Sequence, residues 1–311
     1  MKIACATRWV SVVCVLAFAL RAESALAQAC CAGGSVATPT RLAVYERVAV
    51  GFQTSARQVI GEWNAAGDVG RSTGTERSLD QTIAATFRLA SRWQASASIP
   101  SVETFRSQEG VRAWGGGVGD ATASVRYDAL TLGEWLPWPA VGLILAATAP
   151  TGKPPERSEG TLGTDVTGAG TWEVAGAVHL EQTYHRAYFA VMGETAYRLS
   201  RTISASGMNV KQSYPLRGSA TIWAGYALER GAAAAMYLRG FHQNEASAGS
   251  VSGSALNTAE ARTTLGVAGM APFWDGWRVQ CAVFSDLPFS GWGRNVPATS
   301  GLSVSLVHAW L

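Results

Sequence analysis

The sequence predicts an all-β protein, a transmembrane antiparallel β-barrel of about twelve strands with a polar lumen. Three observations indicate this fold: apolar and polar residues alternate along the chain, long and short connections alternate, and charge is scarce. Only 15% of the residues are charged, whereas 48% are hydrophobic. A typical soluble domain has about 25% charged residues. The chain therefore has fewer of the groups that keep a globular surface hydrated, and its apolar content excludes intrinsic disorder.

The first 27 residues have the pattern of a secretory signal peptide. Lys2 and Arg8 form a basic start, residues 9–20 are an uncharged apolar run, and small residues follow at 25–27. This order is typical of a cleaved export signal, and the run is too short to span a membrane comfortably as a helix. We expect an exported chain. The expected division is a signal peptide at 1–27, a short periplasmic N-terminal segment at 28–41 and an outer-membrane barrel at 42–311.

Cleavage leaves three cysteines, Cys30, Cys31 and Cys281. An adjacent pair with one distant partner is not a disulfide framework. The adjacent pair could bind a soft metal ion, but no second Cys or His pair lies nearby in the sequence. We therefore expect a plain processed N-terminus.

The segment 214–228 shows the alternation clearly. Apolar residues such as Leu216 and Ile222 occupy its even positions, and polar or small residues such as Arg217 and Thr221 occupy its odd positions. Successive side chains of a strand point to opposite faces, so each segment is two-faced. A soluble sandwich or barrel would turn the apolar face inward, whereas an outer-membrane barrel turns it outward. The same alternation is found at 79–89, 121–129 and 257–271.

The connections favour the membrane barrel. Strands are expected near 42–63, 78–91, 93–104, 118–130, 138–150, 169–184, 186–200, 212–229, 232–245, 257–271, 277–288 and 300–311. Long connections near 64–77, 105–117, 151–168, 201–211, 246–256 and 289–299 alternate with short ones. Bacterial membrane barrels have an even strand number, short periplasmic turns and longer external loops. Both chain ends are therefore expected on the periplasmic side.

Aromatic residues gather near both sets of connections. Such rings concentrate at membrane–water interfaces, so the two groups predict two aromatic girdles. The alternative is that they are ordinary core aromatics beside turns. The first group is Trp93, Trp135, Trp138, Tyr184, Tyr188, Phe273, Trp274, Trp277 and Trp310, and the second is Trp63, Trp114, Trp172, Phe241 and Trp292.

Three short motifs resemble a known family. Residues 117–127 (GVGDATASVRY), 149–153 (APTGK) and 162–165 (LGTD) are similar to motifs of the MetA-pathway-of-phenol-degradation, or "transporter", family of outer-membrane proteins. The resemblance covers about 50 residues. It implies a barrel of the bacterial outer membrane and a role in passing small organic compounds. It brings no catalytic residues.

Enzyme motifs are incomplete or missing. Residues 147–153 are similar to a phosphate-binding loop, but Ala147 stands where glycine is required. No G-x-S-x-G elbow occurs, and the four histidines have no metal-ligand spacing. We expect no catalytic residue, metal site or cofactor. The net charge is +3 without a basic cluster, which argues against a nucleic-acid partner.

The polar faces of the expected strands place seven residues of each charge sign in the lumen. Unpaired charges are costly in a low-dielectric wall, so pairing across neighbouring strands is expected. They form either a polar conduit or a salt-bridge mesh that fills the barrel. We predict a monomeric passive channel for small organic or polar solutes. The alternative is a non-conducting structural or interaction barrel that acts through its external loops. The predicted lumen residues are Asp80, Arg88, Asp120, Arg126, Asp128, Glu173, Glu181, Glu194, Arg198, Arg217, Arg239, Glu260, Arg262 and Arg278.

Overall fold

The computed structural model describes residues 41–132, 138–205, 208–228, 231–244, 247–248 and 259–311. The expected signal peptide, Cys30, Cys31 and Trp135 lie outside the described residues. Within the described ranges, no helix is long and apolar enough to cross a membrane.

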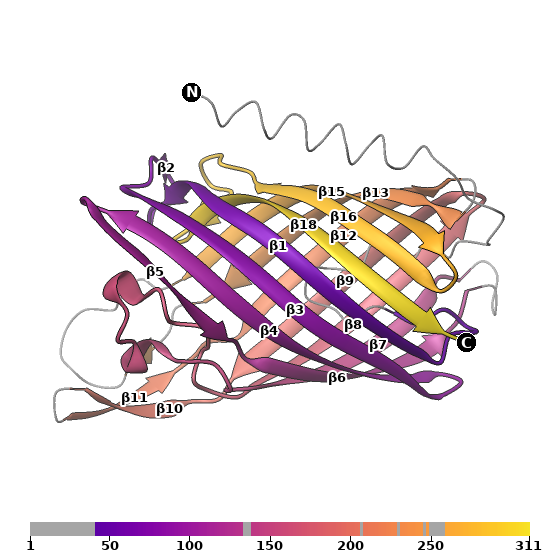
Figure 1. Ribbon diagram of the computed structural model, residues 1–311, viewed down its shortest axis with the longest axis horizontal. Helices are drawn as coiled ribbons and strands as arrows, with labels where there is room; N and C mark the ends of the chain where they lie inside the picture. Colours follow the sequence, from indigo (N-terminus) through magenta and orange to yellow (C-terminus); the bar gives the residue numbers. More distant parts are fainter. Residues whose placement is uncertain (1–40, 133–137, 206–207, 229–230, 245–246, 249–258) are drawn as a thin grey trace.

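Twelve antiparallel strands form a closed barrel, which confirms the predicted fold class. Each strand pairs with its neighbours in chain order, and the pairing of β1 with β18 closes the sheet. All strands are inclined to the long axis of the molecule (Figure 1). The barrel strands are β1 (Val48–Trp63), β3 (Gly74–Ala90), β4 (Trp93–Gln108), β6 (Ala121–Leu130), β7 (Ala140–Ala149), β8 (Glu173–Tyr184), β9 (Ala187–Arg198), β12 (Arg217–Ala227), β13 (Ala233–Gln243), β15 (Glu260–Trp274), β16 (Trp277–Asp286) and β18 (Pro297–Trp310).

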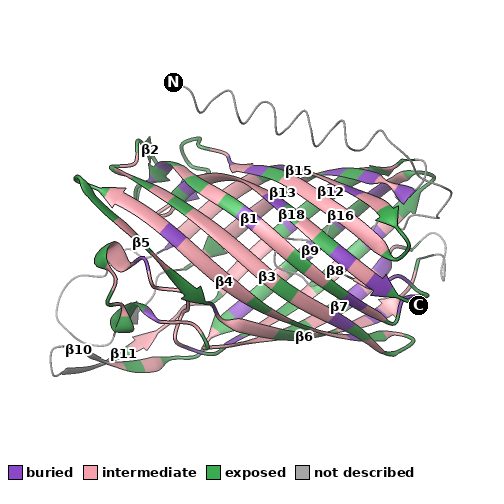
Figure 2. Ribbon diagram, viewed as in Figure 1, coloured by how far each residue is buried: buried purple, intermediate pink, exposed green. Residues whose placement is uncertain are grey.

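The apolar face of each strand points outward. On β12, Ile222 is 54% exposed while its neighbour Thr221 is 1% exposed, and β3 likewise exposes Ile83 and Phe87. Exposed positions therefore alternate with covered ones along the strands (Figure 2). A soluble barrel would show the opposite arrangement, because its apolar side chains must leave water.

The long connections contain more structure than the sequence predicts. The expected loop near 105–117 is a hairpin, because β4 extends to Gln108 and pairs with β5 (Val111–Val118). The prediction of a loop near 201–211 is also wrong, because β10 (Arg201–Ala205) pairs with β11 (Met208–Ser213). β11 in turn pairs with β14 (Ser247–Ala248). Two short strands, β2 (Val69–Gly70) and β17 (Gly293–Arg294), and two short 3-10 helices, η2 (Pro155–Arg157) and η3 (Thr161–Gly163), complete the described elements.

The expected first strand also begins too early, because residues 42–47 are not in a strand and β1 starts at Val48. Arg47 donates its backbone N–H to the Trp310 carbonyl, and Glu46 donates its backbone N–H to the Ala43 carbonyl across a turn. The chain turns at this point, and Leu42 and Ala43 are buried, both 2% exposed.

Three aromatic residues assigned to the girdles lie on the inner side instead. Tyr188 is 1% exposed, Trp63 is 3% exposed, and Phe241 lines the lumen. Strand alternation decides the side, and proximity to a turn does not. The Tyr188 ring fits because residue 225 is glycine, where a Cβ atom would lie 2.3 Å from the ring. Trp93, Trp138, Tyr184, Phe273, Trp274 and Trp310 are exposed beside the short turns, as are Trp114, Trp172 and Trp292 beside the long connections.

Candidate functional site

The barrel encloses a cavity of about 530 Å³. Among the predicted lumen residues, Asp80, Asp120, Arg126, Arg239 and Arg262 line it. Cys281, which forms no disulfide with a described residue, also lines it.

Two walls of different chemistry face this cavity. The polar wall, from β1, β4 and β18, carries Gln53, Ser96, Ser98, Ser303 and Ser305. The apolar wall, from β7, β9, β12 and β13, carries Ile144, Met192, Trp223 and Tyr237. A glycine makes room for one of these rings, since a Cβ atom on Gly266 would lie 2.3 Å from the Tyr237 ring. The cavity can therefore offer hydrogen bonds on one side and an apolar surface on the other.

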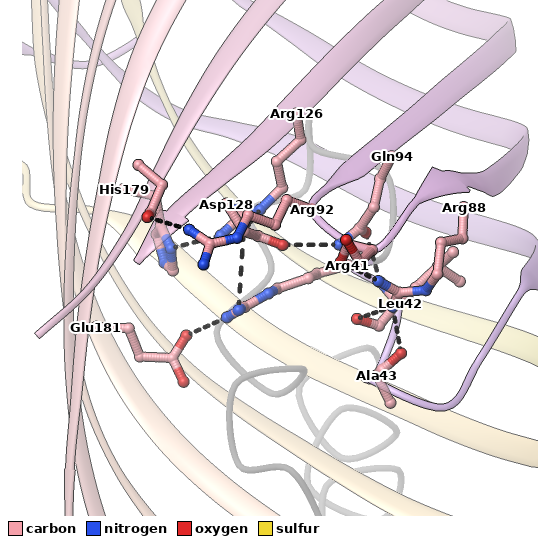
Figure 3. A network of polar contacts seen from close by, with 12 residues as sticks. Arg41, Leu42, Ala43, Arg88, Arg92, Gln94, Arg126, Asp128, His179 and Glu181 are labelled. Carbon is pink, nitrogen blue, oxygen red and sulfur yellow. Dashed lines mark hydrogen bonds and ion pairs between the residues drawn. The ribbon is translucent and has the colours of Figure 1, made fainter. Parts of the chain in front are cut away.

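Residues 41–46, the entry segment, fold against the inner wall at the barrel end that has the short turns. Figure 3 shows Arg41 between two carboxylates of the wall. Its Nη1 lies 2.8 Å from Glu181 Oε2, and its Nη2 lies 3.8 Å from Asp128 Oδ1. Arg126 Nε donates to the same Asp128 oxygen at 2.7 Å. Asp128 is therefore shared by an arginine of the wall and an arginine of the entry segment.

Further wall residues bind the backbone of the entry segment. Gln94 Oε1 accepts the backbone N–H of Leu42 at 3.0 Å, and its Nε2 donates to Asp128 Oδ2 at 3.0 Å. Arg88 Nε donates to the Glu46 carbonyl at 2.8 Å, and Arg88 Nη2 donates to the Ala43 carbonyl. These donors and acceptors come from several strands and hold the entry segment inside the barrel. The segment therefore narrows this end of the lumen.

Glu46 completes this attachment. Its carboxylate accepts from Arg278 Nη1 at 2.9 Å and from Arg278 Nη2 at 3.3 Å, and it also accepts the backbone N–H of Ala43 at 2.7 Å. The structure thus brings Arg88, Arg126, Asp128, Glu181 and Arg278 together around one segment. Sequence reasoning missed Arg41, Glu46 and Gln94. The sequence feature that could have identified Arg41 and Glu46 is a pair of opposite charges just before the first strand.

The other end of the lumen holds separate ion pairs. Glu173 accepts from Arg198 Nε at 2.9 Å and also from Arg217 Nη2. Arg57 pairs with Asp80 across β1 and β3. Glu194 on β9 and Glu260 on β15 also occupy inward-facing strand positions. Among the described residues, however, they take part in no ion pair. The predicted charges are therefore divided between the two ends of the barrel, and they do not form one continuous mesh.

The motifs that carry the family resemblance meet at one place beside the lumen. Asp120 accepts the backbone N–H groups of Gly152 and Ala169 at 2.8 and 2.7 Å, which ties both ends of the 151–168 connection to β6. Inside that connection, Lys153 Nζ donates to Asp165 Oδ2 at 2.6 Å. This hydrogen bond, together with those from Ser158 and the backbone, holds the pKa of Asp165 well below its usual range. The residues of these motifs therefore hold the 151–168 connection in place.

The described residues contain no group of three or more His, Cys, Asp or Glu that could hold a metal ion. His179 lies on the inner wall, where its Nδ1 is 3.4 Å from Arg126 Nη2 and its ring stands edge-on to Trp223 at 6.2 Å. These contacts place it in the polar network of the wall.

No protein-family model matches the chain, and no curated protein matches it. Among solved structures, it is similar to an outer-membrane channel from Pseudomonas putida F1, with a TM-score of 0.69 and 15% identity over 88% of this chain and 100% of that one. The fold is that of an outer-membrane β-barrel. Autotransporter barrels are similar too: the β domain of Bordetella BrkA has a TM-score of 0.50 at 12% identity over 85% of this chain and 100% of that one. The transport unit of AIDA-I from Escherichia coli has a TM-score of 0.50 at 8% identity over 88% and 93%.

Proposed function

We propose that this chain is a monomeric, passive outer-membrane channel, without catalytic activity, for small organic or polar solutes. The cavity of about 530 Å³ between a polar and an apolar wall carries the proposal. A solute with both kinds of surface can exchange its water for partners on the two walls. The family resemblance of residues 117–127, which implies passage of small organic compounds, supports the same function.

In this proposal the outward apolar side chains contact lipid, and the short-turn end faces the periplasm. Glu159 in the long 151–168 connection has a side chain that is 91% exposed, and Asp275 is exposed in a short turn. A membrane-impermeant thiol reagent should label Glu159→Cys in intact cells. It should label Asp275→Cys only after the outer membrane is opened. The opposite pattern would reverse the orientation.

In this proposal the entry segment narrows the path at the short-turn end of the barrel. Its attachments through Arg41 and Glu46 are ion pairs with little exposure, 17% and 7% for those two side chains. We include its displacement in the proposed transport cycle.

Conductance in a planar lipid bilayer tests the channel. The folded protein should give discrete current steps. Ser98→Trp, which adds bulk to the polar wall, should reduce the step size. Ile99→Trp, at the adjacent outward position, should leave the current unchanged and serves as the matched control. Protein that shows heat-modifiable gel mobility but no current would overturn the proposal.

The second candidate is a non-conducting structural or interaction barrel that acts through its external loops. Two observations favour it: the entry segment narrows one end, and the long connections are ordered by hairpins and by the Asp120 and Asp165 contacts. Replacing residues 155–165 with a short glycine–serine linker separates the two functions. A channel should keep its conductance, whereas an interaction barrel should lose its partner.

A further inference from the structure

Two arginines of the cavity wall have no carboxylate partner among the residues that the structure describes. Arg239 on β13 and Arg262 on β15 both line the cavity, at diagonal positions of adjacent strands, because Arg239 lies opposite Thr264 and Phe241 lies opposite Arg262. Diagonal neighbours are within reach of long side chains. Within the described part of the chain, neither guanidinium belongs to an ion pair, in contrast to Arg57, Arg198 and Arg217.

Asp286 and Asp80, which also line the cavity, already have other partners, whereas Glu260 forms no ion pair with either arginine among the described residues. Asp286 accepts hydrogen bonds from Thr264 Oγ1 on one oxygen and from Thr299 N and Oγ1, at 2.8 and 2.9 Å, on the other. Asp80 is held by Arg57. Asp286 and Glu260 act on Arg262 only through space, and Arg239 and Arg57 oppose them. The two guanidinium groups therefore keep N–H donors for a ligand.

An aromatic ring lies next to one guanidinium. The Arg262 guanidinium carbon lies 5.5 Å from the centre of the Phe241 ring, within the range of a cation–π contact. This contact takes up no N–H donor in a hydrogen bond to an acceptor atom, so the guanidinium can donate in the fork geometry that matches a carboxylate. Tyr237, two residues before Arg239 on the same face of β13, continues the apolar wall next to these arginines.

We propose that Arg239 and Arg262 form a binding site for the carboxylate of a small amphipathic organic anion. The apolar body of this anion lies against Phe241 and Tyr237. The inference rests on the proposed function, since it assigns one class of solute to the same lumen. Charge-assisted, bidentate hydrogen bonds are the strongest that such a site can offer.

Isothermal titration calorimetry on the full-length processed protein in detergent micelles tests the site without requiring conductance. The probes are benzoate and the neutral benzamide, which has nearly the same shape. Benzoate should bind saturably, and benzamide should bind at least about tenfold more weakly, because it lacks the charge that strengthens hydrogen bonds to arginine. The double variant Arg239→Gln, Arg262→Gln should lose at least about tenfold in benzoate affinity.

The control variant is Arg77→Gln, Arg112→Gln, which removes the same charge from exposed positions near the long connections and should bind benzoate normally. Arg262→Lys is the second variant if the double variant does not fold. It keeps the charge but loses the planar fork, so benzoate affinity should fall while chloride conductance persists. Equal binding of benzoate and benzamide, or unchanged affinity in the Arg239 and Arg262 variants, would overturn the site. Conductance without benzoate binding would leave the channel standing and remove the site. Benzoate binding without conductance would support the site and overturn the channel.

Discussion

Arg278 holds Glu46 through both of its terminal nitrogens, at 2.9 and 3.3 Å. The contact joins β16, late in the sequence, to the entry segment that precedes β1. The two side chains are only 11% and 7% exposed. β16 lies on the opposite side of β1 from β3, β4, β6 and β8, which carry the other attachments, so this pair holds the entry segment from a second direction.

The first prediction concerns this attachment. Glu46→Gln should release the entry segment, so that single-channel conductance rises while barrel stability falls by no more than about 1 kcal/mol, because water then reaches the Arg278 guanidinium. Arg47→Gln, at an exposed neighbouring position, should change neither quantity. A loss of about 3–5 kcal/mol with unchanged conductance would mean that the segment stays in place and keeps Arg278 buried without the Glu46 carboxylate.

The second prediction tests which side of the wall meets lipid. Ile99 is 56% exposed on the outer side of β4, and the adjacent Ser98 lines the cavity. Ile99→Arg should cost about 2–4 kcal/mol near the bilayer midplane, whereas Ser98→Arg should be tolerated. Guanidinium unfolding of the protein in lipid vesicles measures both. Equal losses would show that the outer side does not face hydrocarbon.

The third prediction concerns the space beside Arg126. A Cβ atom on Gly142 would lie 2.4 Å from Arg126 Nη2. Gly142→Val should therefore push the guanidinium away from Asp128 and destabilise the barrel by about 1–3 kcal/mol, as overpacking does. Gly193→Ala is the matched control, because its added Cβ would meet no atom within 4 Å. Thermal unfolding followed by heat-modifiable mobility should separate the two variants.

The fourth prediction is the pH range over which the 151–168 connection stays closed. The hydrogen bond from Lys153 lowers the pKa of Asp165, so this contact is complete above the usual carboxyl pKa of about 4 and is lost as pH falls through the lowered value. The hydrogen bond to Asp165 raises the pKa of Lys153, so the same contact is complete below about pH 10 and is lost as pH rises through the raised value. Trypsin cleavage after Arg157, measured relative to cleavage of an unstructured peptide at the same pH, should therefore stay slow and constant between about pH 6 and 9.

Asp165→Asn tests the same contact at constant pH. It removes the charge that Lys153, Ser158 and the Glu159 backbone N–H all contact, so cleavage after Arg157 should become faster. Glu159→Gln is the control, since that side chain is 91% exposed and 3.8 Å from Lys153. Rapid cleavage of the unaltered protein at pH 7 would contradict the closed connection.

Some of the site was accessible from the sequence and some was not. The period-two pattern placed Arg126, Asp128 and Glu181 on polar faces, because alternation fixes the side of a strand. The same pattern could not show that Arg41 would join them, since residues 41–46 are not in a strand. It could not assign partners either. Alternation places Arg217 of β12 on the same face as Glu194 of the adjacent β9. The ion pair of Arg217 is instead with Glu173 of β8, two strands away.

By itself, the sequence determined that the chain forms an outward-apolar barrel of twelve strands, because alternation and connection length are local properties of the chain. Only the tertiary structure decided how the interior is divided. The register in which β1 pairs with β18 sets which inward-facing residues lie at the same height in the barrel. The entry segment also reaches the lumen although it is not part of a strand. The narrowing by residues 41–46, the apolar wall around Trp223 and the placement of Arg239 near Arg262 in the cavity wall all depend on contacts between residues far apart in the chain. No periodicity in the sequence records such contacts, because each one is fixed by how the closed sheet brings distant strands together.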